Sequence, residues 1–177
     1  MRSKVEAKEG IFSAATAVSH RLRKMRTLGY AACMETATYL HLPVGQSPPS
    51  LESYRPFKAV LVIEQPADRE WQVVVSEWLV RSGCLYVSAW GQDCETWHDG
   101  VDYANLSAFD FHEIPDDACV MTTWHAHEPL TQALWFAANC AIHPTMALDN
   151  TIIIHISAKE RSAELLKDFQ QARDKDG

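Results

Sequence analysis

The sequence lacks the features by which membrane, secreted and nucleic-acid-binding proteins are commonly recognised. No apolar run approaches the length of a membrane-spanning helix, and no succession of basic, apolar and small residues marks a secretory signal. The formal net charge of −7 argues against nucleic acid or an anionic membrane as the general partner. We therefore expect a cytoplasmic protein that does not enter a membrane.

Cysteine offers neither a disulfide framework nor a zinc-ribbon motif. The five cysteines are odd in number, and no two are spaced as Cys-x-x-Cys. Cys84, Cys119 and Cys140 lie beside or inside apolar runs. We expect reduced, mostly buried thiols that serve packing, as is usual in the cytoplasm.

Motifs that would identify a cofactor or a nucleophile are also missing. The apolar run 59–63 leads into Gln65-Pro-Ala-Asp68, which has no glycine to let a dinucleotide pyrophosphate approach. There is no Walker loop and no Gly-x-Ser-x-Gly elbow. A phosphorylated receiver pocket would need paired acids and an aspartate that ends the third strand, and the sequence has neither. We assign no cofactor from motifs.

The sequence does contain enough apolar residues for one domain, and its charged residues are unevenly distributed along the chain. Apolar residues make up 47% of the 177 residues, including six Trp, which suffices for a full core. Residues 1–28 hold seven Lys/Arg and two Glu (+5), whereas the other 149 hold nine and twenty-one (−12). The basic cluster 20–26 has helical apolar spacing, so it is either an arm for nucleic acid, a membrane or a partner, or a loosely attached leader. We favour the second interpretation, in which residues 1–33 are a loosely attached extension or result from a start codon that is assigned too early. Residues 34–177 then form one α/β domain.

Four apolar runs predict the core strands of that domain. Their continuity indicates strands that are covered on both faces; they lie at 59–63, 84–90, 118–124 and 151–156. A short edge strand is predicted at 38–42. Residues 109–113 alternate like an exposed strand or an extended linker.

Helical spacing follows each core strand. The first helix is capped by Asp68 and stopped by Gly83, and it turns Trp71, Val74, Val75, Trp78 and Leu79 toward the sheet. The second, capped by Asp93, is expected to be short or irregular because it contains Gly100. The third opens at Pro129 and ends at His143-Pro144, and the last carries Leu165, Leu166, Phe169 and Ala172.

The alternation predicts a three-layer α/β/α sandwich around a mainly parallel sheet of four to five strands, flavodoxin-like or Rossmann-like. With the core strands numbered 1 to 4 along the chain, we expect the order 2-1-3-4. Ligands of such sheets bind beyond the carboxyl ends of the strands. The candidate ligand-binding residues are therefore Glu64, Asp68, Trp90, Asp93, Trp124, His125, His127 and Glu128, with Gln92, Ser157 and Lys159 nearby.

A metal site is one hypothesis for this edge. His125 and His127 point to the same side if the strand continues through them, so they could share an ion such as zinc, with Glu128 holding or activating a water. Asp93 or His98 would supply a third ligand. Alternatively, Glu128 caps the following helix, and its carboxylate faces the positive end of the helix dipole. His112, His143 and His155 lie in ordinary structural settings.

Tryptophan gives a second hypothesis. Trp90, Trp97 and Trp124 fall near the same strand ends, among the acids Asp93, Glu95, Asp99 and Asp102. Trp is enriched in binding hot spots, and an acidic rim would steer a basic partner. The alternative, which we favour, is that these rings close the core beneath loops.

Four segments resemble an uncharacterised family of small bacterial domains of unknown function. They are Tyr39-Leu-His-Leu-Pro43, the stretch 56–64, Met121-Thr-Thr-Trp-His125 with Glu128-Pro129, and Ile152-Ile-Ile-His-Ile-Ser157. The resemblance covers residues 38–157 and implies a Rossmann-like domain, but it implies no activity and no catalytic residue. We expect a non-catalytic binding or regulatory module with an unidentified small-molecule or protein ligand, and as the alternative a metal-dependent hydrolase using His125, His127 and Glu128.

Overall fold

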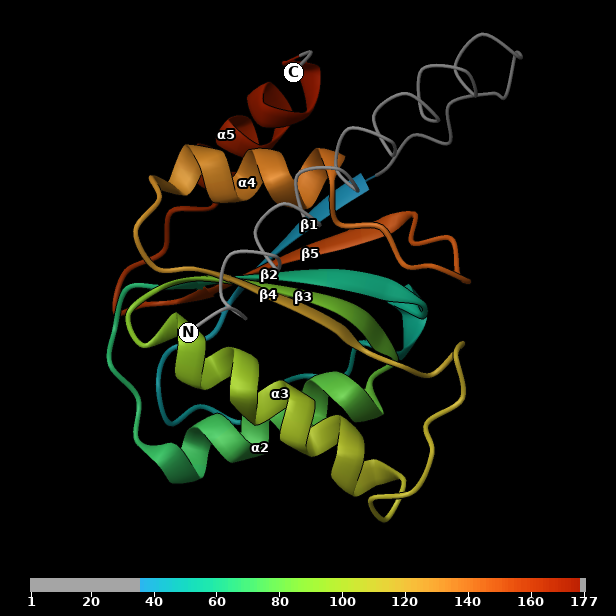
Figure 1. Ribbon diagram of the computed structural model, residues 1–177. Coiled ribbons are helices and arrows are strands. Elements are labelled where there is room, and N and C mark those ends of the chain that lie inside the picture. Colours follow the sequence, from blue (N-terminus) through green and yellow to red (C-terminus); the bar gives the residue numbers. More distant parts are fainter. Residues whose placement is uncertain (1–35, 176–177) are drawn as a thin grey trace, which may run out of the picture. The chain divides into compact units, whose positions relative to one another are not determined.

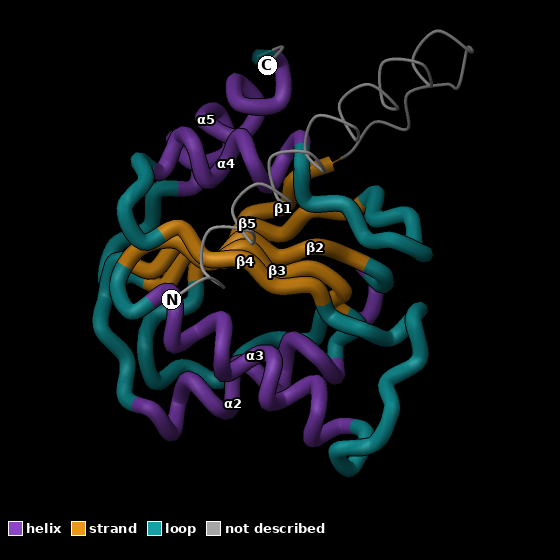
Figure 2. Tube along the Cα trace, viewed as in Figure 1, coloured by secondary structure: helices purple, strands orange, loops and turns teal. Residues whose placement is uncertain are grey.

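The computed structural model describes residues 36–175, and these form a five-stranded parallel sheet between two layers of helices (Figure 1 and Figure 2). The predicted α/β sandwich is thus confirmed. The N-terminal extension 1–33, with its basic cluster 20–26, lies outside the described residues. Within 36–175, no helix is long and apolar enough to cross a membrane.

The strand order is β1-β5-β2-β3-β4, and every neighbouring pair is parallel. The bounds are β1 Thr36–His41, β2 Phe57–Ile63, β3 Cys84–Gly91, β4 Met121–His125 and β5 Asn150–Ile156. The predicted order 2-1-3-4 is wrong, because β4 adds outside β3 rather than beside β2, and β5 inserts between β1 and β2. Counted over the four core strands, the observed order is 3-2-1-4.

The helices divide between the two faces according to the direction in which the chain moves across the sheet. Right-handed crossovers from β2 to β3 and from β3 to β4 place α2 (Arg69–Arg81) and α3 (Cys94–Ala108) on one face. The return from β4 to β5 reverses the direction, so α4 (Leu130–Asn139) and then α5 (Ser162–Asp174) cover the other face (Figure 2). The connection from β1 to β2 carries a single 3-10 turn, Glu52–Tyr54.

The core has two halves because the central strands alternate their side chains between the faces. From β2, Leu61 and Ile63 pack with Trp97 beneath α2 and α3, whereas Val60 and Val62 pack beneath α4 and α5. All seven residues of β2 are buried, as the apolar run predicts for a central parallel strand.

Helix α2 begins and ends where its sequence predicts. Asp68 accepts a hydrogen bond from the backbone N–H of Trp71 at 2.8 Å, and Gly83 takes a positive φ of 82° just after the helix. Trp71, Val75 and Leu79 are buried, which confirms that the helix faces the sheet. The buried face of α2 is narrower than predicted, because Trp78 is only partly buried and Val74 is 48% exposed.

Helix α3 departs from its prediction in three ways. It is fifteen residues long, because Gly100 lies against α2 rather than breaking the helix; a Cβ there would come within 3.0 Å of Ser76 Oγ. Asp93 stands at the N-cap but makes no side-chain capping bond. Residues 109–113 form turns and no strand, since Asp110 and Phe111 both have positive φ.

Candidate functional site

The sheet order creates two topological switch points at the carboxyl edge. The chain leaves β2 toward α2 on one face of the sheet, and it leaves β5 toward α5 on the opposite face. The carboxyl ends of these two neighbouring strands therefore form a switch point. The same is true of β3 and β4, which lead to α3 and α4. Ligands of open α/β sheets bind at such switch points. The candidate site therefore lies at two adjacent places along one edge.

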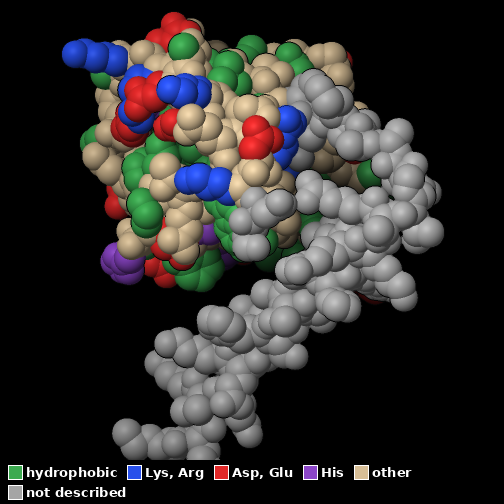
Figure 3. Space-filling view, turned by 90° about the horizontal axis from the view of Figure 1, so that it is seen from above, with side chains coloured by type: hydrophobic (Ala, Val, Ile, Leu, Met, Phe, Trp, Pro, Cys, Tyr) green, Lys and Arg blue, Asp and Glu red, His purple; other side chains and the backbone are tan. Residues whose placement is uncertain are grey.

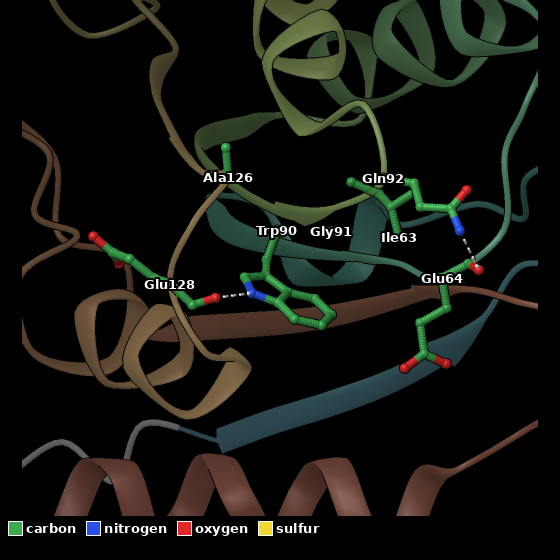
Figure 4. Close-up of a pocket in the computed structure, with 7 residues that line it drawn as sticks. All are labelled: Ile63, Glu64, Trp90, Gly91, Gln92, Ala126 and Glu128. Carbon is green, nitrogen blue, oxygen red and sulfur yellow. Dashed lines mark hydrogen bonds between the residues drawn. The ribbon is translucent and has the colours of Figure 1, made fainter.

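An open pocket of about 450 Å3 lies at the carboxyl ends of β2, β3 and β4. Its lining residues are Ile63, Glu64, Trp90, Gly91, Gln92, Ala126 and Glu128 (Figure 4). Figure 4 shows the Trp90 ring in the middle, with Glu64 and Gln92 on one side and Glu128 on the other. The carboxylates of Glu64 and Glu128 point away from each other, and the indole ring of Trp90 lies between these two residues. The indole is also the largest side chain in the lining.

The floor of the pocket depends on a glycine. Gly91 has φ of 105°, and a Cβ at this position would lie 2.0 Å from the backbone oxygen of Ile63. This close approach lets Gln92 N–H donate to Ile63 O at 2.9 Å, while Gln92 Nε2 donates to Glu64 O at 3.2 Å. The ends of β2 and β3 are thereby joined beneath the ring of Trp90.

A circuit of hydrogen bonds holds that ring. Trp90 Nε1 donates to the backbone oxygen of Glu128 at 2.8 Å, and the Glu128 carboxylate lies 2.8 Å from His125 Nδ1. Because a carboxylate only accepts, His125 Nδ1 carries the proton, and Nε2 accepts from Ser88 Oγ at 3.1 Å. The circuit starts on β3, crosses β4 and returns to β3, so it fixes both the loop after β4 and the indole ring.

The predicted metal pair is arranged differently from the expectation. His125 is buried, its two nitrogens face Glu128 and Ser88, and its ring contacts Phe136, whereas His127 is exposed. Among residues 36–175, no three His, Cys, Asp or Glu side chains are grouped to hold an ion. Pro129, not Glu128, is the N-cap of α4. The zinc site stays an untested prediction.

A second circuit of hydrogen bonds lies at the switch point between β5 and β2. The backbone N–H of Arg161 donates to Tyr39 Oη at 3.2 Å, and the Tyr39 hydroxyl donates to His155 Nδ1 at 2.8 Å. His155 Nε2 donates to one carboxylate oxygen of Glu64 at 3.0 Å, and the Arg161 guanidinium binds the other. Burial raises the pKa of Tyr39, so its hydroxyl keeps the donated proton at neutral pH.

Hydrogen bonds also hold the loop after β5 next to this second circuit. His41 Nε2 donates to the backbone oxygen of Ser157 at 3.0 Å, and Ser157 Oγ donates to Lys159 O at 2.6 Å. His155 itself has no exposed surface, and its ring lies 5.8 Å from that of His41. A buried imidazole with both nitrogens engaged fixes this edge as a rigid wall beside Glu64.

Half of the predicted site residues are brought together. Glu64, Trp90, His125 and Glu128 meet at the pocket or directly behind it. Asp68 caps α2, Asp93 is an exposed helix N-cap, and His127 is exposed. Trp124 does not line the pocket and instead lies 45% exposed on the outer strand, while Trp97 is fully buried in the core.

Sequence reasoning missed the second circuit. His155 was assigned an ordinary strand setting, and Tyr39 and Arg161 were assigned no role. One signal was available: His155 interrupts an isoleucine run, and a polar residue in a fully buried strand needs partners.

The comparison with curated proteins found no match, and neither did the comparison with solved structures. A family model does match residues 37–172, from β1 into α5, so the matched range includes the pocket and both hydrogen-bond circuits. The predicted resemblance to an uncharacterised family is thereby confirmed. The chain belongs to the family described as Domain of unknown function (DUF7684).

Proposed function

We propose that this protein is a non-catalytic binding module that holds a small planar ligand against the ring of Trp90. The observation that carries the proposal is a half-buried indole, fixed through its Nε1, in a 450 Å3 pocket at a switch point of the sheet. That volume falls within the roughly 300–1,000 Å3 of small-molecule sites. A fixed aromatic ring binds another ring by stacking at little cost in conformational entropy.

The charge of the pocket indicates which rings would bind. Its lining contains Glu64 and Glu128 and no Lys or Arg, and the Arg161 guanidinium is already engaged by Glu64. No glycine-rich loop offers backbone N–H groups to a phosphate. The ligand is accordingly uncharged or cationic, as a nucleoside or a free base is, rather than a nucleotide.

Binding is favoured over catalysis by the state of the two buried histidines. The nitrogens of His125 and of His155 all face partners within the protein, so these rings serve to position Trp90 and Glu64. A histidine that acts as a general acid or base must reach the substrate with one of its ring nitrogens. Such preorganised walls lower the entropic cost of binding.

The proposal also includes a Rossmann-like fold, a cytoplasmic location and a bacterial origin. The strand order 3-2-1-4 over the core strands agrees with the first four strands of a Rossmann sheet, which supports the Rossmann-like assignment. The cysteines Cys84, Cys94, Cys119 and Cys140 are free thiols, which supports the cytoplasm. The bacterial origin rests on the sequence resemblance, and the ligand is a small molecule rather than nucleic acid or a membrane.

A thermal-shift experiment tests the proposal. The panel is adenosine, guanosine, cytidine and uridine, the free bases, and the matching 5′-monophosphates, because the phosphates test the charge argument directly. A ligand that binds only the folded state raises the melting temperature by mass action. We expect at least one nucleoside or base to do so, and its monophosphate to do so less.

The matched control comes from the neighbouring strand. Trp90→Ala should abolish the shift, whereas Trp124→Ala removes an equally large but more exposed ring outside the pocket and should leave the shift intact. Equal shifts in wild type and Trp90→Ala, or stabilisation by the phosphates alone, would contradict the proposal. So would a panel that leaves the wild-type protein unchanged.

A further inference from the structure

The outer edge of β4 lies away from the pocket and is unpaired within residues 36–175. β4 ends the strand order and pairs only with β3. An edge strand presents a row of N–H and C=O groups, which proteins commonly protect with Lys, Pro or a bulge. The strand Met121-Thr-Thr-Trp-His125 has no Lys or Pro, and it leaves Met121 37% and Trp124 45% exposed. It is therefore open to a further strand.

Helix α3 runs along the face of the sheet next to β4 (Figure 1), and one side of this helix carries an acidic stripe. The stripe consists of residues at helical spacing on one side of α3: Glu95, His98, Asp99, Asp102, Tyr103 and Leu106. Two contacts join it to β4: Thr122 Oγ1 donates to Asp102 at 2.7 Å, and the rings of His98 and Trp124 are 4.5 Å apart. Edge and stripe thus form one surface.

The charge of this surface is one-sided. From residue 82 to residue 158 the sequence contains ten Asp and Glu and not one Lys or Arg. This segment includes all of β3, α3, β4 and α4. The face over α4 and α5 is different, because Lys and Arg side chains lie among acidic ones there (Figure 3). A partner for the β4 edge therefore meets negative charge that no Lys or Arg of this segment neutralises, although His98 lies 3.0 Å from Asp99 and 3.6 Å from Asp102.

We propose that the outer edge of β4 and the acidic stripe of α3 together bind an extended, Lys/Arg-rich segment of a partner protein. The segment adds to the sheet as a strand, so main-chain hydrogen bonds to β4 supply affinity. Alternate side chains of the added strand point toward α3, where basic groups meet Asp99 and Asp102. The exposed face of Trp124 offers a guanidinium or ammonium a cation–π contact.

A second copy of this chain is a poorer occupant. Antiparallel pairing of two β4 edges about a twofold axis would place both α3 helices on the same face, with their acidic stripes toward each other. Juxtaposed like charges oppose association, whereas a basic segment complements the same surface. The charge therefore selects a partner of different composition.

Labelled octapeptides test the surface by fluorescence anisotropy with the full chain. The probes are (Arg-Val)4, (Glu-Val)4, and two forms of (Arg-Val)4 with alternate backbone nitrogens methylated, one form for each strand edge, so that the methylated edge cannot donate. The protein variants are Met121→Lys/Trp124→Lys and, as the matched control, Val73→Lys/Val74→Lys on α2. Both pairs are exposed apolar residues, so the charge change is equal and the exposure is similar. Circular dichroism establishes that both variants are folded.

We expect (Arg-Val)4 to bind and (Glu-Val)4 not to bind, with affinity that falls as salt rises. Methylation on the pairing edge and the β4 variant should each weaken binding at least tenfold, while the α2 variant changes it less than threefold. No binding of (Arg-Val)4, an equal loss in both variants, or indifference to methylation on either edge would overturn the proposal. A wild-type dimer that the β4 variant abolishes would also overturn it, because the occupant would then be a second copy.

Discussion

Gly91→Ala is expected to destabilise the protein by a margin that follows from the geometry of the pocket floor. The residue has φ of 105°, and its Cβ would lie 2.0 Å from Ile63 O. A positive φ costs an L-residue about 1–2 kcal/mol. The clash is with backbone of a central strand, so the end of β3 must move, which costs about 1–3 kcal/mol as overpacking does. Together these terms predict a loss of about 2–5 kcal/mol, measured as the free energy of unfolding in urea.

Gly45→Ala isolates the steric part of this loss. Gly45 also has a positive φ, 82°, but a Cβ there would meet nothing within 4 Å. Both substitutions reduce the entropy of the unfolded chain equally, so that effect cancels in the comparison. Gly91→Ala should therefore exceed Gly45→Ala by about 1–3 kcal/mol at unchanged denaturant slope. Losses equal within about 0.5 kcal/mol would refute the close approach of β3 to β2.

Three further predictions concern buried polar groups. Tyr39→Phe leaves Arg161 N–H without its acceptor and weakens the support of buried His155, so we expect a loss of about 1–3 kcal/mol in urea unfolding; a loss as small as that of exposed Tyr103→Phe would contradict the circuit. Burial raises the pKa of Cys84 from 9.0 to about 12, so above pH 9 only the unfolded chain loses this proton and stability falls as pH rises. Cys84→Ala should make that fall shallower by up to about 1.4 kcal/mol per pH unit, and an unchanged slope would contradict the burial of the thiol. Protein purified without a His-tag should contain no stoichiometric zinc by mass spectrometry, because both nitrogens of His125 are engaged; zinc lost in His125→Ala would establish the metal site instead.

The elements of the fold are predictable from sequence because their signals are local. The run 59–63 is apolar throughout, and Asp68 and Gly83 bound a segment whose apolar residues recur at helical spacing. The strand order is not local, since every parallel strand can pair with any other. Composition held a clue that the expected order overlooked: β4 carries two threonines and is partly exposed, as an edge strand is, whereas β5 is isoleucine-rich and almost wholly buried.

The candidate site was predictable only in part for the same reason. Glu128 follows His125 by three residues, so their proximity could be inferred, although their role in holding Trp90 could not. The bond between Tyr39 and His155 spans 116 residues and depends on β1 pairing with β5. No short motif records such a pairing.

A crystallographic fragment screen tests the central claim most directly, since it does not require the ligand to be known. Crystals are soaked with uncharged, cationic and anionic ring fragments of matched size. We expect uncharged or cationic rings to stack on Trp90, between Gln92 and Glu128, and anionic rings to be absent from the pocket. An empty pocket while the same fragments bind elsewhere on the surface, or a pocket occupied by anionic rings alone, would contradict the claim.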